Sequence, residues 1–348
     1  MCDVPSANLP YLRNASLFAS GRDALVALVR WGAIRHGWRR VWVPSYYCPE
    51  VPAALAAIAD VVELLVFPDH ALWAPTQVGA IPAIRGDVVV LANQLGVRPR
   101  PDTDAMDALT AGGVILIEDH SHDLGSDWAL RSGADYAFAS LRKTLPLPDG
   151  GAVWSPRGLE LPPEPADTAD STPSATRRLG QALAAQLGRS ATDGAGPLRF
   201  RALARSRWRP SGSGAGEGIL PISRALLPGM PAQAWRERRR RHLAILEHEA
   251  ELPPSARLLQ APQGGVGFAF TMVFATHDEQ RQAIHALAAR AVAPVVLWPL
   301  DTSPKRGVGG PDADLSRRIL SIHCDQRYEE ADMHRLGVIV REALHPGR

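Results

Sequence analysis

The sequence predicts an α/β fold with a mainly parallel sheet flanked by helices, followed by a smaller C-terminal α+β domain. Short apolar runs rich in β-branched residues recur through the first 150 residues, as strands buried on both faces require. Helical stretches separate these runs, which favours βαβ units and a parallel sheet. A helix and strand pattern of another kind fills about the last hundred residues, an ordinary size for a domain.

The expected large domain covers residues 14–245. A helix should open at Ser20 or Gly21, and another should span 50–59. Residues 155–218 are rich in Pro, Ala, Ser, Gly and Arg, which predicts a variable, partly loop-like excursion with a helix near 175–187. A linker between independent domains fits this composition nearly as well. The expected strands of the large domain are 40–43, 61–67, 87–91, 113–117 and 136–139.

The expected small domain covers residues 246–348, after a long helix at 235–249. The basic run at 236–241 in this helix is interpreted as a solvated face, because the overall charge is balanced. The elements expected next are strand 267–274, helix 279–290, strands 294–297 and 319–323, and helix 329–344.

Composition excludes several classes of protein. A net charge of +2 gives no reason to expect nucleic acid or a membrane surface as a partner. Three scattered cysteines cannot build a disulfide framework or a metal site, so a cytoplasmic protein is expected. The beginning of the sequence lacks the order of a signal peptide, and acidic residues interrupt the most apolar stretch.

A carboxylate and an amine follow separate apolar runs. Glu118 and Asp119 end the run that begins at residue 114, and Lys143 follows the run at 136–139. Open α/β sheets bind ligands at the carboxyl ends of their strands, so Asp119 and Lys143 can meet over one crevice.

These residues match what pyridoxal phosphate requires. The cofactor needs a lysine for its imine, a carboxylate at the pyridine nitrogen, a helix N-terminus for the phosphate and a surface for the ring. The candidates for these four requirements, in the same order, are Lys143; Asp119; Ser20, Gly21 and Arg22 with Ser140; and Tyr46, Tyr47 or Cys48. Tyr46 and Tyr47 are equally compatible with an ordinary place in a core or an interface.

Five segments, taken together, resemble the successive motifs of the DegT/DnrJ/EryC1/StrS family of aminotransferases. They occur in the order of that family, and 318–324 (RILSIHC) is similar to the segment that closes its small domain. Nearly the whole chain is covered, apart from residues 155–218. The five segments are 19–25 (ASGRDAL), 43–49 (VPSYYCP), 118–122 (EDHSH), 140–143 (SLRK) and 149–151 (DGG).

The resemblance implies the pyridoxal-phosphate fold of type I and a role for each matching residue. Lys143 would be the Schiff-base lysine and proton shuttle, Asp119 would pair with the pyridine nitrogen, and His122 would lie near the phenolic oxygen of the ring. Asn93 would contact the ring or the substrate. The residues implied for the phosphate are Gly21, Arg22 and Ser140.

The sequence departs from the family at three points. The spacing from Ser140 to Lys143 is short, and Cys48 occupies the usual place of the aromatic residue that stacks on the ring. The asparagine motif that reaches the phosphate from a neighbouring subunit is not recognisable, and Ser223 or Arg224 would take its place. The resemblance also implies a homodimer with shared active sites.

The implied activity is transfer of an amino group from an amino-acid donor, glutamate or glutamine, to a keto or aldehyde acceptor. The acceptor would be a keto-sugar nucleotide or a natural-product ketone. A decarboxylase, racemase or dehydratase using the same cofactor would share the anchoring residues. A different alternative is a metal-dependent hydrolase that uses His120, His122 and Asp123, because alternate residues of an extended segment point the same way.

Overall fold

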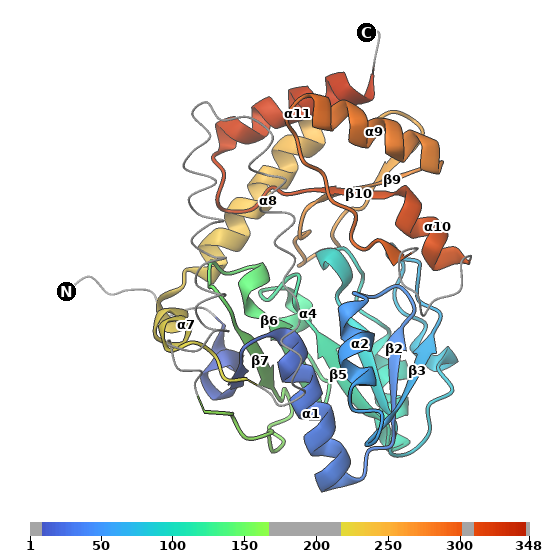
Figure 1. Cartoon of the computed structure of the whole chain (residues 1–348), viewed down its shortest axis with the longest axis vertical. Coiled ribbons are helices and arrows are strands. Elements are labelled where there is room, and N and C mark those ends of the chain that lie inside the picture. The colour runs from blue at the N-terminus through green and yellow to red at the C-terminus, as the bar shows by residue number, and fades with distance from the viewer. Residues whose placement is uncertain (1–8, 167–216, 301–309, 346–348) are drawn as a thin grey trace, which may run out of the picture.

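The computed structural model describes residues 9–166, 217–300 and 310–345 (Figure 1). The helix expected at 175–187 and most of the excursion at 155–218 lie outside the described residues. Within the described ranges, no helix is long and apolar enough to cross a membrane.

A seven-stranded sheet forms the centre of the large domain, in the order β1-β7-β6-β5-β4-β2-β3. The pairings from β3 across to β6 are parallel, whereas β7 runs antiparallel to both β6 and β1. This confirms the mainly parallel sheet and adds two strands that were not predicted, β1 and β7. The strands are β1 Ser16–Phe18, β2 Arg40–Pro44, β3 Glu63–Phe67, β4 Val88–Ala92, β5 Ile115–Asp119, β6 Tyr136–Ser140 and β7 Gly151–Trp154.

Helices cover both faces of this sheet. Helix α1 packs on β6 and β7, and its buried Leu25 and Leu28 join Val41 and Val90 in one apolar cluster (Figure 1). Helix α3 contributes Met106 to a cluster on the other face. The α-helices of this domain are α1 Gly21–His36, α2 Glu50–Ala56, α3 Thr103–Ala111 and α4 Asp127–Leu130. The short 3-10 helices are η1 Pro10–Asn14, η2 Val78–Ala80, η3 Gln94–Gly96 and η4 Leu141–Lys143.

The C-terminal part packs three helices on a three-stranded antiparallel sheet, β10-β9-β8. The strand expected at 294–297 is only a single bridge, between Val295 and Ser321. The boundary expected at residue 245 falls inside α8, whose Trp235 packs on the large domain and whose Leu246 packs in the small one. The remaining elements are α7 Pro221–Leu226, η5 Leu227–Gly229, α8 Ala232–Glu249, β8 Ala256–Leu258, β9 Phe270–Phe274, α9 His277–Ala289, α10 Pro311–Arg318, β10 Ile319–Ile322 and α11 Glu330–Leu344.

Candidate functional site

One pocket collects most of the residues singled out from the sequence. It lies where β2, β5 and β6 end and α1 begins. Strands β5 and β6 are neighbours and parallel, so the residues that follow them emerge side by side at the same edge of the sheet. The predicted residues that line the pocket are Ser20, Gly21, Arg22, Tyr47, Cys48, Asp119, His122, Ser140 and Lys143.

Lys143 is the last residue of η4, directly after β6. Its Nζ lies 3.2 Å from Nε2 of His122. The other ring nitrogen of His122, Nδ1, accepts a hydrogen bond of 3.1 Å from the main-chain N–H of Leu95. The amine is therefore held against a buried imidazole inside the pocket.

Asp119 is the last residue of β5, and hydrogen bonds orient its carboxylate. The hydroxyl of Tyr47 donates to Oδ2 at 2.6 Å, and the main-chain N–H of Ser121 donates to Oδ1 at 2.9 Å. Burial raises the pKa of Tyr47, and the charge of Asp119 raises it further, so the phenol keeps its proton and remains a donor. Among the described residues, no cation forms an ion pair with Asp119. A carboxylate held in this way can receive a cationic ring nitrogen.

The N-terminus of α1 and the end of β6 approach each other closely. Ser20 caps α1 by accepting a hydrogen bond from the main-chain N–H of Asp23. A Cβ atom added to Gly21 would lie only 2.9 Å from Cβ and from the main-chain N of Ser140. Free N–H groups at a helix N-terminus attract anions. Glycine therefore keeps open a cradle between the first turn of α1 and Ser140.

Trp298 lines the pocket and was not singled out from the sequence. Its ring centroid lies 5.6 Å from that of His122 and 6.0 Å from Nζ of Lys143. Tyr46 is fully buried and contacts the backbone next to Trp298. Its hydroxyl donates to the carbonyl of Leu297 at 2.7 Å and accepts from the main-chain N–H of Trp298. Tyr47, rather than Tyr46, is thus the tyrosine that faces the pocket.

Arg142 and Glu50 also line the pocket and were not singled out. Glu50 pairs with Arg22 at 3.0 Å. Burial raises the pKa of the Cys48 thiol, so Cys48 is present there as the neutral thiol. The sequence signal for Arg142 was its place next to Lys143.

The remaining candidates lie elsewhere. Asn93 donates to Oγ of Ser126 at 3.3 Å and lines a neighbouring cavity, not the Lys143 pocket. Within the same chain, Ser223 donates to Asp149 at 2.5 Å and Arg224 pairs with Glu164 at 2.8 Å.

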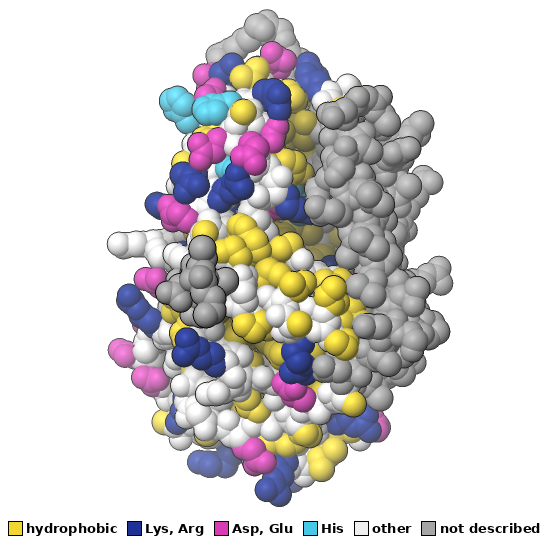
Figure 2. All heavy atoms as spheres, turned by 90° about the vertical axis from the view of Figure 1, so that its left-hand side faces the viewer, with side chains coloured by type: hydrophobic (Ala, Val, Ile, Leu, Met, Phe, Trp, Pro, Cys, Tyr) yellow, Lys and Arg dark blue, Asp and Glu magenta, His cyan; other side chains and the backbone are white. Residues whose placement is uncertain are grey.

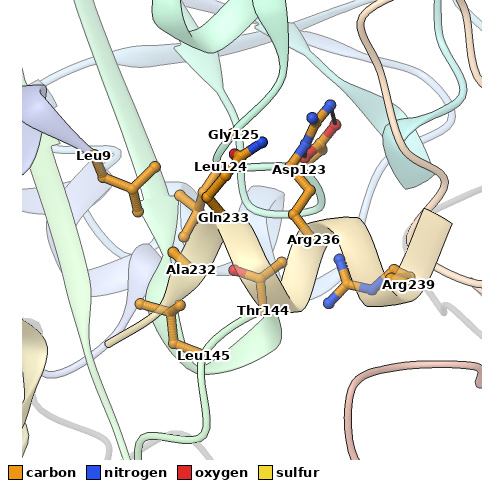
Figure 3. Close-up of a pocket in the computed structure, with 10 residues that line it drawn as sticks. All are labelled: Leu9, Asp123, Leu124, Gly125, Thr144, Leu145, Ala232, Gln233, Arg236 and Arg239. Atoms are coloured by element: carbon orange, nitrogen blue, oxygen red, sulfur yellow. Dashed lines mark hydrogen bonds and ion pairs between the residues drawn. The ribbon is translucent and has the colours of Figure 1, made fainter. Parts of the chain in front are cut away.

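The side chains of the metal alternative do not converge. His120 lies 2.9 Å from Glu118, whereas His122 faces Lys143. Figure 3 shows that Asp123 points instead to Arg236, at 2.8 Å. The described part of the chain holds no group of three His, Cys, Asp or Glu side chains that suits a metal ion. The alternative of a metal-dependent hydrolase therefore has no ligand set among the described residues.

Solved structures of aminotransferases share this architecture. DesI, crystallised in the presence of its TDP-sugar product, is 20% identical, with a TM-score of 0.61 over 98% of this chain and 86% of DesI. Helicobacter pylori PseC, an aminotransferase involved in the biosynthesis of pseudoaminic acid, is 13% identical, with a TM-score of 0.62 over 95% of this chain and 86% of PseC. The 3-amino-5-hydroxybenzoic acid synthase is 18% identical, with a TM-score of 0.61 over 95% of this chain and 86% of that one.

No protein-family model and no curated protein matches the sequence. At identities of 20% or less, the similarity to these structures concerns the fold. The chain has the fold of these aminotransferases, a mainly parallel seven-stranded sheet flanked by helices with a smaller C-terminal α+β part.

Proposed function

We propose that this protein is a pyridoxal-phosphate-dependent aminotransferase of the DegT/DnrJ/EryC1/StrS type. The observation that carries the proposal is that Lys143 and Asp119, from the ends of adjacent parallel strands, line one pocket. The fold shared with solved aminotransferases supports it, because their reaction needs this pair of groups.

The pocket fits the cofactor at each of its parts. Lys143 supplies the amine, and Asp119 supplies a carboxylate with no described counter-ion. The cradle between Gly21 and Ser140 offers helix N–H groups to a phosphate, and a Cβ atom at Gly21 would fill it. Trp298 offers an aromatic surface in the same pocket. These are the four requirements stated from the sequence.

The bound cofactor supplies a ring that withdraws electrons from the carbon next to the transferred nitrogen. Asp119 holds the proton on the ring nitrogen that makes this withdrawal effective. Nζ of Lys143 takes the proton from the α-carbon of the donor and delivers one to the carbon that receives the amino group. His122 holds Nζ in place, and the ring centroid of Trp298 lies 6.0 Å from the amine.

For the substrates, we infer an amino-acid donor, glutamate or glutamine, and a keto acceptor that is a sugar nucleotide or a natural-product ketone. DesI was solved with a TDP-sugar product, and PseC serves the biosynthesis of pseudoaminic acid. A decarboxylase, racemase or dehydratase would use the same anchoring residues. Such an enzyme would transfer no amine to any keto acid, which separates the alternatives.

We further propose a cytoplasmic homodimer with shared active sites. Helix α7 leaves Ile222 and Leu226, one turn apart, each 46% exposed. Figure 2 shows hydrophobic side chains gathered on the face where α7 lies. Light scattering should give twice the mass of the chain, and Leu226→Glu should shift the protein toward the monomer. A wild-type protein that is monomeric at micromolar concentration would contradict this.

The central experiment is to trap the cofactor. Purified protein with pyridoxal phosphate should be yellow, lose the colour on borohydride, and carry the reduced adduct on the peptide that contains Lys143. Lys143→Ala should carry none, and an adduct formed in that variant would overturn the site. Transfer is then tested with glutamate and a panel of keto acceptors, by the appearance of 2-oxoglutarate.

A further inference from the structure

Arg142 precedes Lys143 in η4 and lines the same pocket. Its side chain is exposed. Among the residues that the structure describes, none accepts a hydrogen bond from its guanidinium or forms an ion pair with it. The N–H groups of this arginine, directly beside the reactive lysine, are therefore available to a ligand in the pocket.

The other cationic side chains of the pocket already have partners. Arg22 forms an ion pair of 3.0 Å with Glu50, and Lys143 lies 3.2 Å from His122. Surrounding protein lowers the pKa of Arg142 by desolvation, although Glu50 opposes this. Because the side chain is exposed, water solvates the guanidinium, and an anion that enters the pocket can replace that water with charge-assisted hydrogen bonds.

The position of Arg142 favours an oxyanion. It shares the pocket with the N-terminus of α1 and with Ser140, where the cradle at Gly21 lies open. Helix N–H groups and a guanidinium that line one pocket can together bind a phosphate or a carboxylate. The planar guanidinium can donate two parallel hydrogen bonds to either group.

We propose that Arg142 is the oxyanion anchor of this pocket. It donates its paired N–H groups to a phosphate monoester or to a carboxylate. Under the proposed function, on which this assignment of sources rests, the phosphate is that of the cofactor and the carboxylate is that of the amino-acid donor.

Calorimetric titration of the cofactor-free full chain tests the anchor itself. Inorganic phosphate and glutarate are titrated into wild type, Arg142→Ala, Arg142→Lys and Arg35→Ala. Arg142→Ala should weaken at least one anion by about 10- to 100-fold, the value of a charge-assisted bidentate contact, and Arg142→Lys should fall between. Arg35 is 65% exposed and near the other end of α1, so its loss is a control for net charge. Unchanged binding of both anions in Arg142→Ala would overturn the inference.

A second titration identifies the source of the oxyanion. If it is the cofactor phosphate, Arg142→Ala loses affinity for pyridoxal phosphate and keeps its affinity for pyridoxal. If it is the donor carboxylate, both cofactor affinities persist and the dissociation constant of glutamate from the loaded enzyme rises. If none of these changes while the adduct on Lys143 still forms, the inference fails and the proposed function stands. A wild type that forms no adduct defeats the proposed function, and the phosphate titration still decides the role of Arg142.

Discussion

Nζ of Lys143 lies 3.2 Å from Nε2 of His122, while Nδ1 of the same ring accepts the main-chain N–H of Leu95. Nδ1 therefore carries no proton. Burial lowers the pKa of His122 well below its usual value, and a positive charge on Lys143 would lower it further, so the ring is neutral. A neutral imidazole next to Nζ holds the amine in the pocket without a second positive charge beside it.

The first prediction concerns His122→Phe. Without the imidazole, Nζ of Lys143 loses the contact at 3.2 Å that holds it in the pocket, so the adduct should form more slowly. A hydrogen bond worth about 1 kcal/mol corresponds to roughly a fivefold change in rate. The measurement is the rate at which borohydride-reducible adduct forms at one fixed pH, which should fall by that amount.

His122→Gln is the matched control for this prediction. The glutamine amide can accept from Leu95 and hydrogen-bond to Lys143, so its rate of adduct formation should stay close to that of wild type. If His122→Phe forms the adduct at the wild-type rate, the ring does not position the amine.

The second prediction concerns Tyr47→Phe. This change removes the donor of the 2.6 Å hydrogen bond to Asp119 and leaves a buried carboxylate oxygen without it. The cofactor-free protein should lose about 1–3 kcal/mol in free energy of unfolding. Bound cofactor should restore part of this loss, because a protonated ring nitrogen donates to the same carboxylate. Urea denaturation with and without pyridoxal phosphate measures both effects. An equal loss in the two states would show that the ring does not reach Asp119.

The sequence was sufficient to predict the two strand-end groups. Lys143 and Asp119 each follow a continuous apolar run, and the carboxyl ends of neighbouring parallel strands share one edge of the sheet. The same criterion was insufficient for Asn93, because the chain turns into η3 after β4 and the side chain meets Ser126. A strand end gives the location of a residue but not the direction of its side chain.

Residues that reach the pocket through tertiary packing had no local signal. Trp298 lies in a segment without helical or strand periodicity, and its contact with His122 depends on how the small domain packs on the large one. Tyr46 and Tyr47 are adjacent in sequence and face different environments, Leu297 for one and Asp119 for the other. No property of the dipeptide distinguishes which tyrosine faces the pocket.

The third prediction concerns Gly21→Ala. The new Cβ atom would lie 2.9 Å from the backbone of Ser140, so the start of α1 must move away from the end of β6. The cradle for the phosphate widens, and affinity for pyridoxal phosphate should fall by about tenfold, the loss of roughly one charge-assisted hydrogen bond. Affinity for pyridoxal, which lacks the phosphate, should change less. Gly79→Ala is the control, because nothing lies within 4 Å of a Cβ atom there.

The fourth prediction concerns stability and pH at a buried pair away from the pocket. Asp69 accepts a hydrogen bond of 2.7 Å from Arg98, and both side chains are almost fully buried. Burial raises the pKa of Asp69 to about 6 from 3.8, although Arg98 opposes the shift. The folded protein therefore holds a proton, between about pH 4 and pH 6, that the unfolded chain has released.

Protonated Asp69 stabilises the folded protein at low pH, because the unfolded chain favours the ionised carboxylate. This contribution to the free energy of unfolding is lost as the pH rises through about 6. Asp69→Asn cannot titrate, so the stability of wild type relative to this variant should fall by about 2 kcal/mol between pH 4.5 and pH 7. Urea denaturation at both pH values measures the difference, and Asp60→Asn on the surface is the control substitution. A difference that does not change with pH would mean that Arg98 keeps Asp69 ionised throughout this range.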